Sequence, residues 1–156
     1  MRYKLIFSLF LLHLTSIYGQ TIKSAYAYGE EDSKSNILCQ FSNKSAISAM
    51  ESALRYNRVN IVRSSEKSGI IKFYTAITNW EVDKSNCSVN MHLDVHDFKA
   101  IQLPGSNKLI YSKVIFCERS VTGFLGKLEM QTNINAKIKE SVDECLSDIE
   151  KNAIGS

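Results

Sequence analysis

A strict alternation of apolar and polar residues near the middle of the chain constrains the fold most strongly. From residue 89 to residue 96 the apolar positions are Val89, Met91, Leu93 and Val95, and the polar ones are Asn90, His92, Asp94 and His96. This two-residue period is typical of a β-strand that has one face in the core and one face outside it. We therefore expect a sheet built around the stretch from residue 70 to residue 119.

Besides the strand that contains this alternation, three other segments have the character of strands, because they are rich in β-branched and aromatic residues. The four expected strands cover residues 59–63, 70–82, 87–103 and 109–119. Short polar turns separate them, so neighbours in sequence are expected to pair as an antiparallel meander. The alternation changes near Asp97 and Phe98, which predicts a β-bulge. Residues 121–129 contain two glycines and are expected to be irregular or to extend the last strand.

Segments with helical periodicity flank the strands. The first follows Ser42 or Asn43 as its cap, and its apolar stripe is Ala46, Ile47, Met50, Ala53 and Leu54. The second begins at Asn133, with a stripe of Ile134, Ile138, Val142, Cys145 and Ile149. Each helix is expected to cover apolar sheet surface. The sequence thus predicts an α+β fold in one domain, residues 36–154: a helix, a four-stranded antiparallel meander and a C-terminal helix packed on the sheet.

The first 19 residues have the pattern of a secretory signal peptide. Arg2 and Lys4 precede a short apolar run, residues 5–12, that is too short to span a membrane comfortably. Cleavage is expected after Gly19, although a small-x-small pattern allows it as late as Ala27. The polar segment 20–35 is expected to be flexible. We therefore expect an exported protein, periplasmic or secreted, with no stable membrane anchor after cleavage.

All four cysteines lie beyond the expected signal peptide: Cys39, Cys87, Cys117 and Cys145. An even number of cysteines in an exported chain indicates two disulfides, and four cysteines allow three connectivities. No two of them have the close spacing of a zinc knuckle. The second helix turns Cys145 toward the sheet, where Cys117 is a suitable partner. This leaves Cys39 to pair with Cys87.

The charge of the expected mature chain is close to neutral. Cleavage after Gly19 removes Arg2 and Lys4, which takes the 19 basic side chains to 17, against 16 acidic ones. A near-neutral chain without a basic cluster argues against nucleic acid as the main partner. It also argues against an electrostatic membrane anchor.

His92, Asp94 and His96 fall on one face of the alternating strand. Two imidazoles and a carboxylate at this spacing could supply three ligands to zinc or copper. The same pattern is also what an ordinary strand with a solvated face produces. The sequence contains none of the common metalloprotease, nucleophile-elbow, phosphate-loop or EF-hand motifs. No cofactor is therefore expected, and an enzyme is the less favoured interpretation.

The pairing register between the strands at 70–82 and 87–103 decides which residues surround these histidines. A connection with an even number of residues around Lys84 would place position 80 opposite 89 and position 74 opposite 95. Phe73 and Ile77 would then lie beside His96 and His92 on the outer face. A connection of odd length would put Phe73 and Ile77 in the core instead.

A sheet face that mixes aromatic, aliphatic, imidazole and carboxylate groups resembles a protein-binding surface. We therefore interpret the chain as a small exported binding protein without catalytic activity, of the inhibitor, immunity or envelope-assembly type. Its unidentified protein partner would contact Phe73, Ile77, His92, Asp94 and His96. The alternative is a metal-binding protein or metal-dependent enzyme that uses His92, Asp94 and His96.

Overall fold

A computed structural model describes residues 22–64, 70–105 and 107–154 of the chain. The expected signal peptide, residues 1–19, lies outside the described residues. The elements in chain order are β1 (Ser24–Gly29), α1 (Lys34–Leu38), α2 (Asn43–Tyr56), β2 (Asn60–Ile61), β3 (Ile71–Glu81), β4 (Asn86–Gln102), β5 (Leu109–Gly126) and α3 (Lys127–Ile154). No helix in these ranges is both long enough and apolar enough to cross a membrane.

The strands form one mixed sheet in the order β2-β1-β3-β4-β5. Strand β1 is parallel to both of its neighbours, whereas β3, β4 and β5 form an antiparallel meander. The α+β class and the C-terminal helix are confirmed. The expected four-stranded antiparallel sheet is wrong, because β1 lies between β2 and β3. Helix α2 lies in the connection from β1 to β2, as a parallel pair requires a crossover.

The segment that the sequence predicts to be flexible, residues 20–35, contains β1 and the start of α1. Ala25 and Ala27 are buried on the side of the sheet that faces α2, and Tyr26 and Tyr28 point to the other side. The prediction failed because the alternating pattern is short and its apolar members are only alanines. Strand β1 is held from both sides by β2 and β3, which supply the hydrogen bonds that a short isolated strand would lack.

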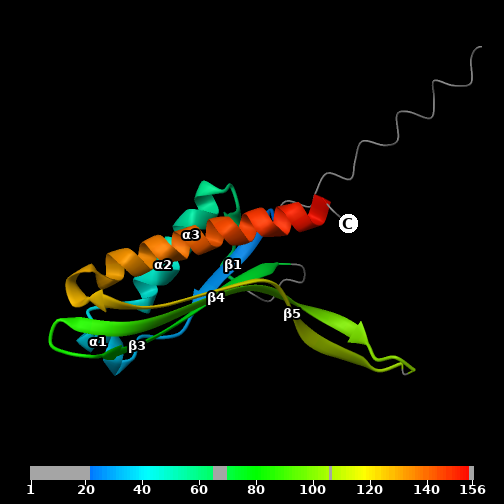
Figure 1. Ribbon diagram of the computed structural model, residues 1–156. Coiled ribbons are helices and arrows are strands. Elements are labelled where there is room, and N and C mark those ends of the chain that lie inside the picture. Colours follow the sequence, from blue (N-terminus) through cyan, green and yellow to red (C-terminus); the bar gives the residue numbers. More distant parts are fainter. Residues whose placement is uncertain (1–21, 65–69, 106, 155–156) are drawn as a thin grey trace, which may run out of the picture.

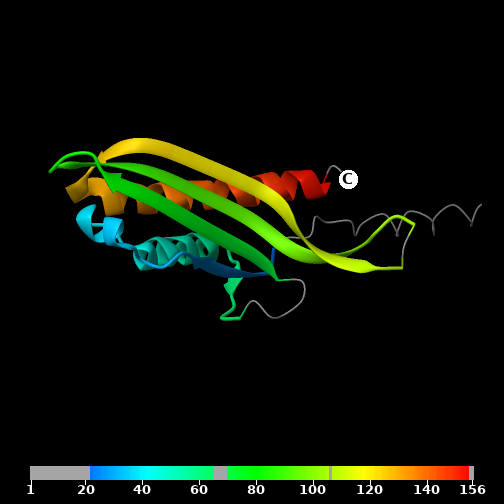
Figure 2. The same ribbon diagram turned by 90° about the horizontal axis from the view of Figure 1, so that it is seen from below.

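The molecule has two layers, with α2 and α3 lying across one face of the sheet (Figure 1). The core fills the space between these layers. Its members from the sheet include Phe73, Ile77, Met91 and Leu93, and those from the helices include Met50, Leu54, Ile134, Ile138 and Val142. We call the opposite side of the sheet, which α2 and α3 do not cover, the outer face. Strands β4 and β5 continue beyond the other strands as a projecting hairpin (Figure 2).

The register between β3 and β4 differs by one residue from the even-length expectation. Glu81 pairs with Cys87, Ile77 with Met91 and Phe73 with Val95, so five residues connect the paired positions. A one-residue change in register moves every side chain to the other face. Phe73 and Ile77 are therefore buried beneath the helices, at 0% and 4% exposure. Their expected place on the outer face is wrong.

The side chain of Asp83 explains the odd length of this connection. Its Oδ1 accepts hydrogen bonds from the backbone N–H groups of Ser85 and Asn86, at 2.7 and 2.9 Å. The N–H of Val82 in turn donates to the carbonyl of Asn86 at 3.0 Å. Aspartate commonly stabilises turns in this way, by accepting from the backbone two or three residues ahead.

Other boundaries differ by smaller amounts. The first long helix begins as predicted: the Ser42 hydroxyl accepts a hydrogen bond from the N–H of Ser45 and caps α2. The bulge lies between Val95 and His96, slightly earlier than expected. Residues 121–126 extend β5, and α3 begins at Lys127 instead of Asn133. Strand β5 and helix α3 are thus continuous in sequence.

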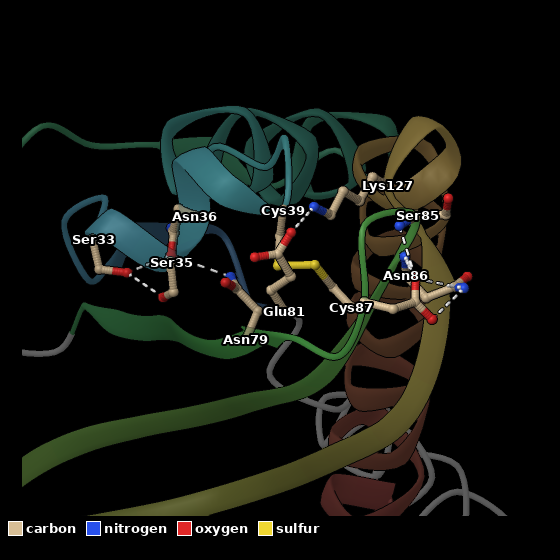
Figure 3. The surroundings of a disulfide bond; sticks show 11 residues. Ser33, Ser35, Asn36, Cys39, Asn79, Glu81, Ser85, Asn86, Cys87 and Lys127 are labelled. Carbon is tan, nitrogen blue, oxygen red and sulfur yellow. Dashed lines mark hydrogen bonds and ion pairs between the residues drawn. A yellow bond between two sulfur atoms is a disulfide. The ribbon is translucent and has the colours of Figure 1, made fainter.

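The two predicted disulfides are confirmed. Cys39, just after α1, bonds to Cys87 at the start of β4, and Cys117 of β5 bonds to Cys145 of α3. Figure 3 shows the first bridge, with the ion pair between Glu81 and Lys127 beside it. One disulfide joins the N-terminal part of the chain to the sheet, and the other fixes α3 on it.

Candidate functional site

The outer face consists of rows of side chains from paired positions on β3, β4 and β5. From one end to the other, these rows are Trp80–Ser88–Phe124, Thr78–Asn90–Thr122, Ala76–His92–Ser120, Tyr74–Asp94–Glu118 and Lys72–His96. Tyr26 and Tyr28 of β1 extend the face beside β3. The structure therefore brings His92, Asp94 and His96 together, as predicted, but separates Phe73 and Ile77 from them.

Three tyrosines cover the end of the face where β1 lies. The ring centroids of Tyr26 and Tyr28 are 5.4 Å apart, and those of Tyr28 and Tyr74 are 5.0 Å apart. The ring of Tyr28 also meets His96 edge-on at 6.1 Å. Aromatic rings at these separations contribute more than their buried area alone. The result is an aromatic cover over the polar groups of β4.

Asp94 and His96 are buried under this cover, at 2% and 0% exposure. Oδ1 of Asp94 contacts Nδ1 of His96, and Oδ2 accepts from the Lys113 ammonium at 2.8 Å. The other ring nitrogen, Nε2 of His96, lies 3.2 Å from the Tyr28 hydroxyl. These contacts join β1, β4 and β5 in one chain of polar groups. Every buried polar group in that chain has a partner, which is what allows it to be buried.

Burial keeps the imidazole of His96 neutral. Its pKa is lowered from the ordinary value of 6.5, chiefly because burial disfavours the charged form, although the hydrogen bond to Asp94 opposes the shift. A carboxylate can only accept, so Nδ1 carries the proton and Nε2 accepts from the Tyr28 hydroxyl. The pKa of Tyr28 is raised, by burial first and then by the charge of Asp94.

The connection Tyr28–His96–Asp94 has the order of a nucleophile, a base and an orienting carboxylate. The electrostatics of this group argue against an activated nucleophile, which needs a lowered pKa, because the pKa of Tyr28 is raised. Tyr28 therefore stays protonated and donates to His96. We read this group as a support that fixes the aromatic cover in place.

His92 lies toward the open middle of the outer face. Its Nδ1 is 3.0 Å from the Ser120 hydroxyl, and its Nε2 is 3.7 Å from Oδ2 of Asp94. Both nitrogens of His96 are already directed at Asp94 and Tyr28. Within the described ranges, no three His, Cys, Asp or Glu side chains have the placement needed to hold a metal ion. The alternative interpretation, a metal site formed by His92, Asp94 and His96, therefore has no geometric support here.

The opposite end of the outer face is apolar and exposed. Trp80 and Phe124 flank Ser88 in one row, and they are 50% and 75% exposed. Ser88 between them is only 2% exposed. Sequence reasoning missed both aromatics, because the even register put Trp80 in the core and residues 121–129 were expected to be irregular. The Asp83 turn signal, which favours the odd register, could have placed Trp80 correctly.

The middle rows of the outer face carry small side chains: Ala76, Thr78, Ser120 and Thr122. A strip of small residues between two aromatic ends allows another surface to approach the strands closely.

Comparisons with known proteins do not indicate a ligand: no model of a protein family matches the chain, and no curated protein matches it.

Proposed function

We propose that this chain is an exported, disulfide-stabilised binding protein without catalytic activity, which binds a protein partner through the outer face of its sheet. One observation carries the proposal. Trp80 and Phe124 stand exposed at one end of the outer face, beside a strip of small side chains. Exposed apolar patches of this kind often mark interaction sites.

The chemistry of the patch suits a protein partner. Trp and Tyr are enriched among the residues that dominate binding energy at protein interfaces, and aromatic residues in general are enriched there. Ser88 is already buried between Trp80 and Phe124, so a partner that covers the two rings has little polar surface to dehydrate. The polar residues around them, such as Asn90 and Thr78, would form the rim.

The other end of the face contributes rigidity. Tyr28 and Tyr74 are held by ring contacts and by hydrogen bonds to His96 and to Glu30, the latter at 3.1 Å. Burial and the bond to Glu30 raise the pKa of Tyr74 to about 12. A surface whose side chains are already ordered loses less conformational entropy on binding.

Export is supported by the covalent structure. Two disulfides are typical of proteins that function outside the cytosol. The expected signal peptide, with its basic start and short apolar run, agrees with this location. We propose that the mature chain acts in the periplasm or after secretion.

Capture of the partner by matched variants tests the proposal. Phe124→Ser removes a 75% exposed ring from the outer face, and Tyr56→Ser removes an 85% exposed ring at the end of α2, away from it. Both proteins are coupled to a resin, incubated with an extract of the native host, and compared with the unaltered chain. We expect one specific protein to be retained by the unaltered chain and by Tyr56→Ser, and lost from Phe124→Ser.

Equal retention by all three proteins, with thermal melts unchanged, would show that the outer face does not bind the partner. Loss from Tyr56→Ser alone would place the interface on the helical side of the molecule. Either result would overturn the proposed binding face.

A further inference from the structure

The end of the β4–β5 hairpin projects as a two-stranded ribbon, which we call the distal arm (residues 98–105 and 107–116). Strand β4 pairs with β3 only as far as His96, whereas its pairing with β5 continues from Phe98 opposite Lys113 to Gln102 opposite Leu109. Figures 1 and 2 show this ribbon extending past the rest of the sheet. Among the described residues, no third strand pairs with the arm.

Both faces of the distal arm expose large apolar side chains. Phe98, Leu109 and Tyr111 lie on the side that continues the outer face, because Phe98 is opposite Lys113, which contacts Asp94. Ile101 and Ile110 pair with each other on the reverse side. Tyr111 is 80% exposed, Leu109 61% and Phe98 51%. In an ordinary hairpin, polar and apolar side chains alternate along each strand, and the apolar face packs against the rest of the protein. Because the distal arm exposes apolar side chains on both faces, we expect another surface to contact both of them.

The charge of the distal arm has one sign. Between residues 98 and 116 the sequence contains three lysines, Lys99, Lys108 and Lys113, and no acidic residue. The nearest preceding acid, Asp97, is buried and paired with Lys72 at 3.3 Å. The expected mature chain is near neutral as a whole, but this segment is locally basic and apolar.

We propose that the distal arm binds the headgroup region of an anionic phospholipid bilayer. This region accepts apolar side chains from both faces of a thin element, while lysines reach the lipid phosphates along their flexible stems. Tyrosine is also favoured at this depth, where one end of its ring is apolar and the other is hydrated. The ribbon has open edges whose backbone groups need hydrogen bonds, so it lies in the interface and does not enter the hydrocarbon.

Charge favours a bilayer over a second copy of the chain. Lys113 already pairs with Asp94 at 2.8 Å. Pairing two distal arms would still bring Lys99 and Lys108 of both copies together without an acid from either arm, whereas anionic lipid supplies the opposite sign. Such a contact is peripheral and reversible, and it is separate from the protein-binding outer face proposed above. Binding of the distal arm by a protein instead of lipid is one of the results that the test below can give.

Vesicle flotation with the exported protein tests the inference. Vesicles of phosphatidylcholine alone are compared with vesicles that contain about one third phosphatidylglycerol, at low and at high salt. We expect partitioning onto the anionic vesicles to be about tenfold stronger, and to weaken with salt because the lysine contribution is screened. Equal partitioning onto both vesicles, or none onto either, would overturn the proposal.

Matched variants locate the contact. Lys99→Glu and Tyr111→Ser alter the distal arm, whereas Lys139→Glu and Tyr56→Ser make the same changes at exposed positions of α3 and α2. We expect the arm variants to lose most anionic-vesicle binding and the helix variants to keep it, with all four melting alike. If the two pairs bind equally, the arm is not the contact. Capture of a protein by the arm without any vesicle binding would likewise refute the proposal.

Discussion

Ile77 lies directly opposite Met91 in the β3–β4 ladder, and both side chains are buried beneath the helices. This one pairing determines the sides of the sheet for all residues from 72 to 81. It sends Phe73 inward with Ile77, and it sends Tyr74 and Trp80 to the outer face. The binding surface that we propose exists only in this register.

The variant Ile77→Asp tests the register. It places a carboxylate without a partner at a position only 4% exposed, next to Met91 and other apolar side chains. We expect the free energy of unfolding to fall by roughly 3–5 kcal/mol, as is usual for an unpaired charge in a core. Urea denaturation measures this change.

Thr78→Asp is the matched control, because Thr78 is the next residue along the same strand and is exposed on the outer face. Its effect should stay within about 0.5 kcal/mol. Equal effects of the two substitutions would mean that neither side of β3 is buried as described.

The disulfides should contribute strongly to stability. Cys39–Cys87 spans 48 residues and Cys117–Cys145 spans 28. On a chain-entropy basis, replacing either pair by serine should lower the free energy of unfolding by about 4 kcal/mol. Denaturant unfolding of the two double variants checks the magnitude. Peptide mapping without reduction checks the pairing, and a Cys39–Cys117 or Cys39–Cys145 peptide would contradict the structure.

Stability should fall in mildly acidic solution because of His96. Its pKa in the folded protein is below the ordinary 6.5, so the unfolded chain binds a proton more readily. The stabilisation is therefore complete above the unfolded pKa and is lost as the pH falls toward the lower folded value. The groups that face this imidazole are Asp94, Lys113, Lys72 and Tyr28.

Thermal melts between about pH 7.5 and 5.5 measure this dependence, since most carboxylates stay ionised in that range. His96→Gln removes the titrating group and should flatten the curve, even though it lowers the melting temperature overall. An unaltered chain whose melting temperature does not change over this interval would contradict the buried neutral imidazole.

The position of β1 restricts where the proposed signal peptide can be cleaved. Ala25 is fully buried and pairs with both Ile61 and Ile71, so cleavage after Ala27 would remove the centre of a strand that β2 and β3 share. We expect N-terminal sequencing of the exported protein to begin at Gln20. A chain that begins at Tyr28 should unfold at a clearly lower temperature than one that begins at Gln20. Equal melts would show that β1 is dispensable.

Local patterns predicted the elements with strong periodicity. The stripe from Ala46 to Leu54 and the Ser42 cap predicted α2, and the alternation around Met91 predicted β4. Cysteine count and the inward position of Cys145 on its helix predicted both disulfides. These signals depend on residues near each other in the chain, or on a small number of possible pairings.

Features that depend on distant partners were not predictable in the same way. Strand β1 is too short to reveal itself, and its place between β2 and β3 comes from pairing across more than thirty residues. The face on which Trp80 lies depends on a single residue in the turn at Asp83. The burial of Asp94 and His96 depends on Tyr28, which comes from that unexpected strand.

Site-specific photo-crosslinking tests the proposed binding face most directly. A photoreactive amino acid replaces Thr122 in the middle of the outer face or, in a second protein, Lys139 on the exposed side of α3. Each protein is produced in the native host, irradiated there and analysed by denaturing electrophoresis and mass spectrometry. The account predicts one discrete protein adduct from position 122 and none from position 139. An adduct only from position 139, or the same adducts from both positions, would contradict it.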